Sequence, residues 1–324
     1  MHVLGIETSC DETSAAIVRG GRKVLSNVVS SSLSLHCRYG GVIPEIASRM
    51  QLETIAAVTE AAFKKAAVGL NDIDAISVTS GPGLLGSLLV GISFSRALGL
   101  SAAIPVLEVN HLMSHIYAVF LNSSKVPALP FVALVVSGGH TSLFHVTGFG
   151  AAEELGHTRD DACGEAFDKV AKLLGLAYPG GPLIEKIASK GDCRRIKFNC
   201  SDTRQPLDFS FSGIKTAVMY LVRKKKELAP KEKRDIAASF QEAVFGVLVD
   251  KAISACRMQG AKNLVVAGGV AANSRLREKF IFSCRQAGVG CYFPAPSLCT
   301  DNAAMVAGLG CRIFKEGGKG AVYA

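Results

Sequence analysis

The feature that most constrains the fold of this chain is an order of elements that occurs twice. Residues 3–18 contain an apolar run, a polar turn and a second apolar run, and residues 131–146 repeat this order. Each segment is typical of a β-hairpin with a polar tip. A strand, a glycine turn and a helix come later in each half, first over 74–98 and again over 263–286. The repetition indicates an internal duplication.

Amphipathic helices lie between these landmarks and decide the fold class. Apolar residues recur at helical spacing over 43–65, 162–174 and 236–258. Strands combined with helices on this scale predict an α/β protein. The chain has 324 residues, which corresponds to about two domains at roughly 150 residues each.

Composition and charge limit the classes of function. Apolar residues make up 49% of the chain and charged residues 19%, which excludes a disordered protein. The formal net charge of +9 predicts a polyanionic partner without identifying it. Within the basic run 223–234, we consider Arg223, Lys224, Lys225 and Lys226 as candidates for phosphate contacts. A solvated charged face is the alternative interpretation of this run.

Three features predict a cytoplasmic protein without a membrane segment. None of the ten cysteines is spaced C-x-x-C, so the thiols fit a reducing cytosol better than a zinc ribbon or a thioredoxin site. Residues 1–13 contain no lysine or arginine and three acidic residues, which argues against a signal peptide. The longest uncharged run, 75–95, contains four glycines and a proline and favours a strand, a turn and a helix over a membrane span.

A pair of histidines suggests a metal site. His111 and His115 are four residues apart, so they share one face of a helix for which Asn110 is a suitable N-cap. A helix N-terminus disfavours imidazolium, and we therefore expect both rings to be neutral and able to bind a metal. The site is not the H-E-x-x-H of zinc proteases, because Leu112 occupies the position of the glutamate. Two histidines that share a face by chance are the alternative.

Asp301 is a candidate third ligand. It follows a proline-containing loop and begins a helical segment over 301–307. A hydrolytic or transfer metal usually has a third protein ligand and an open position. The alternative is that Thr300 or Asp301 only caps the helix.

Two glycine-containing turns suit a phosphate. Backbone N–H groups in the turn Ser137-Gly138-Gly139-His140 can bind an anion. The alternative is an ordinary hairpin turn, which has the same sequence pattern. The Gly268-Gly269 pair precedes a helix whose first turn holds Asn273. Neither turn matches the P-loop or the dinucleotide-binding pattern.

Asp168 allows two interpretations. It lies four residues before Lys172 on the helix that precedes the loop Tyr178–Pro182, so the pair could be a surface ion pair of little consequence. Alternatively, Asp168 points at a hydroxyl or amine of a ligand.

Nine segments, in the same order along the chain, closely resemble the bacterial tRNA N6-adenosine threonylcarbamoyltransferases, the TsaD family, formerly described as O-sialoglycoprotein endopeptidases. The resemblance extends from about residue 2 to residue 310. The segments are GIETSCDETSAAIV, GGVIPEIASRMQ, TSGPGLLGSLLVG, NHLMSH, LVVSGGHTSLF, DDACGEAFDKVAKLLGLAYPGGP, FSFSGIKTA, VAGGVAANSRLR and TDNAAMVA.

The resemblance implies the two-lobed α/β fold of actin, the Hsp70 ATPase domain and sugar kinases. Each lobe has a ribonuclease-H-like sheet, and a cleft lies between the lobes. We expect an N-terminal lobe over 1–125 and a C-terminal lobe over 126–324. The second lobe carries a helical insertion at about 160–258, and the last helix is a candidate to pack back on the first lobe.

The resemblance also implies an activity. The enzyme transfers the threonylcarbamoyl group from threonylcarbamoyl-adenylate to N6 of the adenosine adjacent to the anticodon, in tRNAs that read codons beginning with A, and releases AMP. His111, His115 and Asp301 are the implied metal ligands, with no covalent nucleophile, and Glu12 is a candidate for the rim of the site. The implied substrate-binding residues are Val135, Val136, Ser137, Gly138, Gly139, Asp168, Gly181 and Asn273.

The implied cofactor is one divalent metal ion per subunit, iron(II) with zinc as the alternative. The implied partners are tRNA, an inactive paralogue of the same fold (TsaB) and a small ATPase (TsaE). Two other functions remain open from the sequence. An ATPase or small-molecule kinase of the same fold group would leave the two histidines and the aspartate unexplained, and a metalloprotease would lack its H-E-x-x-H pattern.

Overall fold

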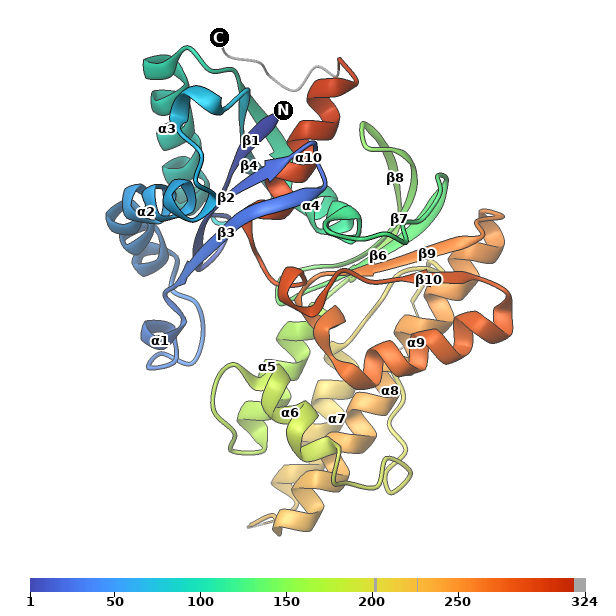
Figure 1. The fold of residues 1–324 in the computed structure, drawn as a ribbon. Coiled ribbons are helices and arrows are strands. Elements are labelled where there is room, and N and C mark those ends of the chain that lie inside the picture. Colours follow the sequence, from blue (N-terminus) through green and yellow to red (C-terminus); the bar gives the residue numbers. More distant parts are fainter. Residues whose placement is uncertain (201–202, 226, 318–324) are drawn as a thin grey trace. The chain divides into compact units, whose positions relative to one another are not determined.

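The computed structural model describes residues 1–200, 203–225 and 227–317. The chain divides into two compact units (Figure 1). The first unit comprises Met1–Val126 and the segment that begins at Pro294, and the second comprises Pro127–Phe293. The four basic residues proposed for phosphate contacts belong to the second unit, except that Lys226 lies outside the described residues.

The first unit contains a five-stranded mixed sheet. Its strand order is β3-β2-β1-β4-β5, in which β1 runs antiparallel to β2 and parallel to β4. The apolar side chains of the central strands are almost completely buried, because helices cover both faces of the sheet. The strands are β1 (His2–Glu7), β2 (Glu12–Arg19), β3 (Lys23–Ser31), β4 (Ala75–Gly81) and β5 (Val106–Asn110).

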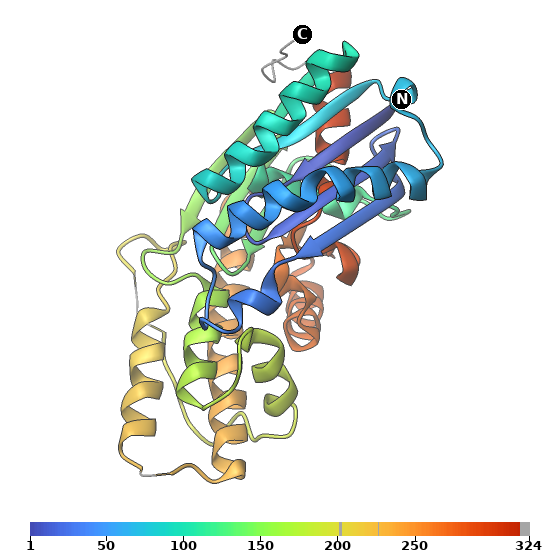
Figure 2. The same cartoon turned by 90° about the vertical axis from the view of Figure 1, so that its left-hand side faces the viewer.

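The helices of the first unit form two layers around this sheet. α2 (Pro44–Ala66) and α3 (Leu85–Ala102) pack on one face, which is turned toward the viewer in Figure 2. α10 (Ala303–Lys315) packs against β1, β2 and β4 and contacts α4 (His111–Tyr117). α10 can approach β1 closely because Gly5 has no side chain: a Cβ there would lie 2.2 Å from the carbonyl oxygen of Ala303. The short helices are α1 (Leu33–His36), η1 (Leu70–Asp72), η2 (Ala118–Phe120) and η4 (Pro296–Leu298).

Among the described residues, α3 is the one helix that is long and apolar enough to cross a membrane, by length and composition only. In the structure one side of this helix lies directly on the sheet, and 28% of its residues are buried. A Cβ at Gly91 would lie 2.3 Å from Oγ1 of Thr8, and one at Gly99 would lie 2.4 Å from a methyl group of Val106. The strand, turn and helix predicted for residues 75–95 are confirmed by β4 and α3.

The second unit contains another five-stranded mixed sheet. Its order is β10-β9-β6-β7-β8, and β6 runs antiparallel to β7 and parallel to β9. Read from the other edge, this order and these directions repeat those of the first sheet. The predicted duplication is therefore confirmed. The strands are β6 (Phe131–Val136), β7 (Thr141–Gly148), β8 (Ala151–His157), β9 (Asn263–Ala267) and β10 (Gly290–Tyr292).

A helical layer accompanies the second sheet. The long helix α8 packs against β6 and β9 and also contacts α6, α7 and α9. Phe167 of α5 packs against Phe240 and Phe245 of α8, with ring centroids 4.9 Å and 5.5 Å apart. The helices are α5 (Cys163–Leu173), α6 (Gly180–Ala188), α7 (Ser212–Arg223), α8 (Pro230–Met258), η3 (Gly269–Ala272) and α9 (Ser274–Ala287). None of the ten cysteines, all of which lie among the described residues, forms a disulfide bond.

Candidate metal centre and substrate-binding turns

Two histidines of the first unit face the same point from one helix. Oδ1 of Asn110 accepts a hydrogen bond from the backbone N–H of Met113, which confirms the predicted N-cap and starts α4 at His111. The imidazole rings of His111 and His115 are buried and meet edge to face, with centroids 4.6 Å apart. The helix start therefore fixes the positions of both rings.

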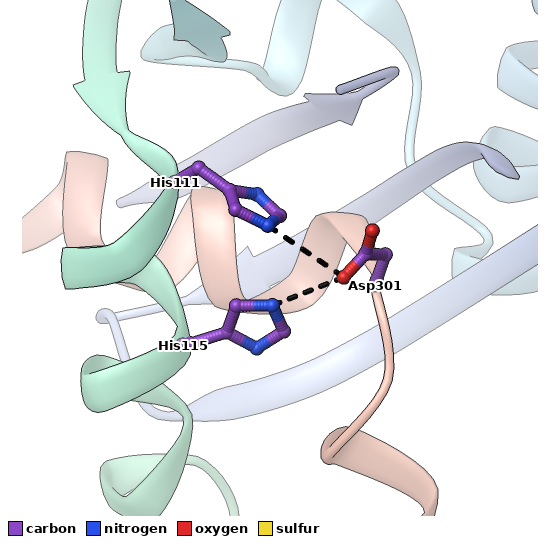
Figure 3. Close-up of side chains that lie close together, drawn as sticks. All are labelled: His111, His115 and Asp301. Carbon is purple, nitrogen blue, oxygen red and sulfur yellow. Dashed lines mark hydrogen bonds and ion pairs between the residues drawn. The ribbon is translucent and has the colours of Figure 1, made fainter. Parts of the chain in front are cut away.

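Asp301 meets these rings from the loop before α10. Its Oδ1 atom lies 3.0 Å from Nε2 of His115 and 3.7 Å from Nε2 of His111 (Figure 3). The alternative in which Thr300 or Asp301 caps the helix is wrong, because Oδ1 of Asn302 accepts the N–H of Met305 as the cap of α10. The capping bond of Asn302 leaves the carboxylate of Asp301 directed at the histidines.

The three side chains form a candidate metal site. One ligand atom from each lies within 4.8 Å of the other two. Bonds of about 2.1 Å to a tetrahedral metal place neighbouring ligand atoms about 3.4 Å apart, close to the 3.0 Å and 3.7 Å between Oδ1 of Asp301 and the two histidine nitrogens. Two imidazole nitrogens and one carboxylate oxygen also suit a divalent transition metal and leave coordination positions for a substrate. The residues present therefore fit a divalent metal ion.

Glu7 is a neighbour of the candidate site that sequence reasoning missed. Its Oε2 atom lies 3.2 Å from Nδ1 of His111 and accepts a hydrogen bond of 2.6 Å from Oγ1 of Thr79. The backbone N–H of Ser9 donates to Oε1 at 2.6 Å. A carboxylate on Nδ1 directs Nε2 of His111 toward Asp301 and sets the tautomer that binds a metal. The available signal was an acidic residue at the end of an otherwise apolar strand.

The acidic surroundings govern protonation at this site. Burial opposes charge on the His111 ring, but the carboxylates of Glu7 and Asp301 outweigh it and raise the pKa of His111 to about 9. Conversely, burial would raise the pKa of Glu7, but the charge of His111 holds this pKa below its ordinary value. The expectation that the helix N-terminus keeps both rings neutral is thus wrong for His111, because the charges of Glu7 and Asp301 favour its protonated form when no metal is bound. The two carboxylates favour a cation there, whether a proton or a metal.

Glu12 lies close to the same carboxylates. Burial, followed by the charges of Asp301 and Asp11, raises the pKa of Glu12 to about 10. Gln51 of α2 holds this hairpin tip, because its Nε2 donates to the carbonyl oxygens of Cys10 at 2.8 Å and Glu12 at 3.0 Å. The tip that carries Glu12 is therefore fixed to the body of the first unit.

The glycine turn of the second unit offers fewer donors than the sequence implied. Val135 and Val136 lie inside β6, in register with Ser142 and Thr141 of β7. The N–H of Ser137 donates to the carbonyl oxygen of His140. The other two predicted binding residues of this turn are Gly138 and Gly139. A Cβ built at either glycine would have no neighbouring atom within 4 Å. These two glycines leave open space beside the backbone.

Asp168 faces the start of the next helix. Its Oδ1 accepts a hydrogen bond of 2.7 Å from the backbone N–H of Gly180, and Gly181 also donates to this carboxylate. Burial nevertheless raises the pKa of Asp168 above its ordinary value. The ion pair with Lys172 is not among the contacts of the described residues. The structure thus brings Asp168 and Gly181 together.

Asn273 is a buried helix cap. Its Oδ1 accepts the N–H of Leu276 and thereby starts α9, and its Nδ2 donates to Oε1 of Gln241 at 3.2 Å. Gly268 precedes it with a φ of +92°, and a Cβ there would lie 2.3 Å from the carbonyl oxygen of Val136. Only glycine fits this position, so the approach of η3 to β6 depends on it.

Comparison with known proteins decides the family. The model of the family "tRNA N6-adenosine threonylcarbamoyltransferase" (TsaD) matches residues 23–308. The chain belongs to this family. It is 51% identical over 320 residues to the tRNA N6-adenosine threonylcarbamoyltransferase of Syntrophus aciditrophicus, covering 98% of this chain and 94% of that protein. It is also 51% identical to the enzyme of the same name from Symbiobacterium thermophilum, covering 97% of this chain and 92% of that protein.

Solved structures agree with the fold. Component A of (R)-2-hydroxyglutaryl-CoA dehydratase from Acidaminococcus fermentans matches with a TM-score of 0.57 and 16% identity, over 96% of this chain and 98% of that chain. HypF of T. kodakarensis matches with a TM-score of 0.65 and 17% identity, over 98% of this chain and 48% of that chain. These likenesses and the duplicated sheets confirm the expected fold class.

Membership of the threonylcarbamoyltransferase family establishes the activity. The enzyme transfers a threonylcarbamoyl group to N6 of an adenosine in tRNA, so tRNA is its substrate. The polyanionic partner predicted from the net charge is accordingly a nucleic acid. The kinase and metalloprotease alternatives receive no support from relatives that match at 51% identity over nearly the whole chain.

Proposed function

We propose that His111, His115 and Asp301 hold one divalent metal ion per subunit, iron(II) with zinc as the alternative. The single observation that carries this proposal is the approach of Asp301 to two histidines from which it is separated by 186 or more residues. Two imidazoles and one carboxylate are a donor set that non-haem iron(II) and zinc both accept. Such an ion, when bound, polarises oxygens of the substrate as a Lewis acid.

We further propose that the donor is threonylcarbamoyl-adenylate and the acceptor is the adenosine adjacent to the anticodon, in tRNAs that read codons beginning with A. The donor is a mixed anhydride, so its carbamoyl carbon is already activated. The N6 amine forms a bond to this carbon and loses one proton to water, while the bond between the carbon and the phosphate oxygen breaks and its electron pair leaves with AMP. A covalent nucleophile is therefore unnecessary, and the enzyme acts by holding the reactants in place.

Residues of the second unit are proposed to bind the donor: Val135, Val136, Ser137, Gly138, Gly139, Asp168, Gly181 and Asn273. The open space beside Gly138 and Gly139 supports an approach of substrate oxygens to their backbone N–H groups. Val135 and Val136 support the turn from inside the strand. Asp168, Gly181 and Asn273 are proposed to hold the adenylate, and we propose that Glu12 lies at the rim of the site.

Protein partners are proposed as well, namely an inactive paralogue of the same fold and a small ATPase. An apolar face of α3 supports docking of another protein. Leu85, Leu89 and Leu100 are 76%, 54% and 82% exposed, and their spacing places them along one side of the helix. Exposed apolar patches of this kind mark interaction sites. Because its substrate is tRNA, we propose that the enzyme works in the cytoplasm.

The test supplies the complete enzyme set with pre-formed threonylcarbamoyl-adenylate and unmodified tRNA, and then analyses the nucleosides of the digested tRNA. We expect N6-threonylcarbamoyladenosine with the wild type and with the control His157→Ala, and at least a tenfold lower yield with Asp301→Ala. Transfer that proceeds equally well without this chain would overturn the proposal.

A further inference from the structure

The net charge of the chain is concentrated in one of its two units. Residues Pro127–Phe293 contain 24 lysines and arginines and 16 aspartates and glutamates, a net charge of +8. The first unit contains 12 cationic and 11 anionic residues, so its net charge is only +1. Of the net charge of +9, the second unit therefore carries +8. We expect this unit, rather than the first, to attract a polyanion.

Within the second unit, one loop carries several exposed cations, and all but one of them lack a carboxylate partner among the described residues. We define the basic loop surface as Lys190, Arg194, Arg195 and Lys197, together with Lys231 at the start of α8. All five side chains are exposed. Among the described residues, the one ion pair they make joins Arg194 to Asp192 at 4.0 Å, and the Arg194 side chain is 93% exposed. Among the described residues, six other cations of this unit are paired with carboxylates, namely Arg159, Lys169, Lys215, Lys225, Arg275 and Lys279.

Backbone contacts fix this loop along α8. The N–H of Asp192 donates to Oδ1 of Asp235 at 2.9 Å, and the N–H of Ile196 donates to Oγ of Ser239 at 3.2 Å. Gly191 lies directly on the helix, because a Cβ there would be 2.2 Å from the carbonyl oxygen of Arg234. The loop therefore holds its cations at set positions, which reduces the ordering entropy lost on binding.

Lys231 extends the same surface by one helical turn. Residues 231, 235 and 239 lie on one face of α8, since each is four positions from the next. The loop contacts Asp235 and Ser239 on that face, so Lys231 is next to the part of the loop that contains Lys190. The five cations therefore come from two segments that lie side by side, the loop and the first turn of α8.

In the run 223–226, Lys225 is less available to a phosphate than the cations of this surface, whereas Arg223 and Lys224 are exposed and stay candidates. Lys225 forms an ion pair with Glu232, and Glu232 also accepts the backbone N–H of Ala229. Lys226 lies outside the described residues. A cation already paired with a carboxylate gains less from a phosphate, because the first pair must be broken.

We propose that the basic loop surface binds the sugar-phosphate backbone of the tRNA substrate. Lysine and arginine side chains without carboxylate partners contact phosphates at little cost, and each contact releases a counterion from the nucleic acid. Such contacts position the RNA without reading its sequence. This suits an enzyme that must accept several tRNAs. The inference rests on the proposed choice of acceptor tRNAs, and it adds the surface that holds them.

The test compares two variants that each lose four positive charges. The first combines Lys190→Gln, Arg195→Gln, Lys197→Gln and Lys231→Gln. The matched control combines Lys23→Gln, Lys64→Gln, Lys65→Gln and Lys125→Gln, all exposed residues of the first unit without ion pairs in the described structure. Equilibrium binding of unmodified tRNA is measured at several salt concentrations, and circular dichroism verifies that both variants are folded.

The slope of log K, the logarithm of the association constant, against log salt concentration is negative. We expect the magnitude of this slope to fall by about 3 in the loop variant, because four phosphate contacts are lost and each contributes about 0.7–0.9. Its Kd at low salt should rise about tenfold or more, while the control stays within about twofold of the wild type. Equal losses in both variants would overturn the inference in favour of bulk charge. An unchanged Kd and slope in the loop variant would overturn it as well.

A membrane is the competing partner of a basic surface. Vesicles of phosphatidylglycerol and phosphatidylcholine test it directly: if the loop variant loses vesicle binding but retains tRNA binding, the inference is wrong. The rate of threonylcarbamoyl transfer at saturating tRNA separates this inference from the proposed function. The loop variant should retain this rate, because none of the substituted residues lies at the metal centre. Absence of transfer with the wild type would contradict the proposed function instead.

Discussion

Nδ1 of His111 lies 3.2 Å from Oε2 of Glu7, a contact between residues that are 104 positions apart. Both side chains are buried, and Glu7 is further held by Thr79 and Ser9. The contact joins the end of β1 to the start of α4, two elements of the same unit. At the proposed metal site, a carboxylate in this position would orient the imidazole of His111 rather than bind the metal itself.

Replacing Glu7 should therefore weaken metal binding without removing a ligand. Loss of such a partner carboxylate typically costs about 10–100-fold in metal affinity, and we expect this loss for Glu7→Gln. Competition titration with a chelator measures the affinity. The control is Glu45→Gln, because Glu45 forms only an exposed ion pair with Arg49. Wild-type affinity in Glu7→Gln would show that the contact does not orient His111.

Removing the ligands themselves should have a larger effect. We expect the double variant His111→Ala, His115→Ala to retain less than about a tenth of the wild-type metal content. Losing a residue that only hydrogen-bonds a ligand already lowers metal affinity about tenfold or more, and here two ligands are lost. Elemental analysis of the purified chain provides the measurement. The control His2→Ala, His157→Ala also removes two imidazoles but leaves the candidate site intact. Equal metal content in both double variants would show that the metal lies elsewhere.

Metal affinity should rise with pH. The pKa of His111 is raised to about 9 by Glu7 and Asp301, against the effect of burial, so a proton must leave the ring before it binds a metal. The apparent affinity should increase about tenfold per pH unit below pH 9 and level off above it, for one displaced proton. Chelator competition between about pH 6.5 and pH 9.5 measures the slope. In Glu7→Gln the plateau should begin at a lower pH, and a flat profile in the wild type would contradict the assignment.

The sequence predicted the local parts of this architecture well. Asn110 caps α4 as expected, because a cap involves only residues three positions apart. The two hairpins were visible because β1, β2, β6 and β7 are rich in apolar residues. The edge strand β8 (Ala151–His157) was missed, because its residues are mostly exposed and it therefore lacks an apolar pattern.

Contacts between distant residues could not be predicted in this way. Asp301 and Asn302 are adjacent acceptors, and only the structure shows that Asn302 caps the helix while Asp301 turns to the histidines. Likewise, the hydrogen bond of Asp168 to Gly180 depends on how the following loop folds back. The family resemblance supplied the candidate metal ligands, but it did not supply Glu7, whose side chain reaches His111 from the end of β1.

A side chain at Gly5 should disturb the packing of α10 on β1. A Cβ there would lie 2.2 Å from the carbonyl oxygen of Ala303 and 2.7 Å from the nitrogen of Ala307, and neither backbone atom can move without the helix. Overpacking of this kind costs about 1–3 kcal/mol, and we expect Gly5→Ala to lower Tm by several degrees. Thermal unfolding followed by circular dichroism tests this. Gly41→Ala is the control because its Cβ meets open space, and equal Tm values would show that α10 is not in close contact with β1.

The last prediction concerns acid stability of the second unit. Oδ1 of Asp161 lies 2.7 Å from Nζ of Lys169 on α5, and Oδ2 lies 2.6 Å from Nζ of Lys215 on α7. Burial opposes ionisation, but the two lysines outweigh it and hold the pKa of Asp161 below its ordinary value of 3.8. Because the folded-state pKa is the lower one, the ionised carboxylate stabilises the fold above about pH 4. This contribution disappears as the pH falls through the folded-state pKa. We therefore expect Asp161→Asn to reduce the free energy of unfolding by about 1 kcal/mol near pH 7, a value that allows for the partial exposure of Lys169.

Urea unfolding at neutral pH and at about pH 3 measures this difference. The gap between Asp161→Asn and the wild type should narrow at the lower pH, because the wild-type carboxylate is then increasingly protonated. Glu153→Gln is the control, since Glu153 is exposed on β8 and makes no ion pair within the described structure. A gap that stays constant between the two pH values would show that Asp161 stabilises α5 and α7 through its shape or hydrogen bonds rather than through its charge.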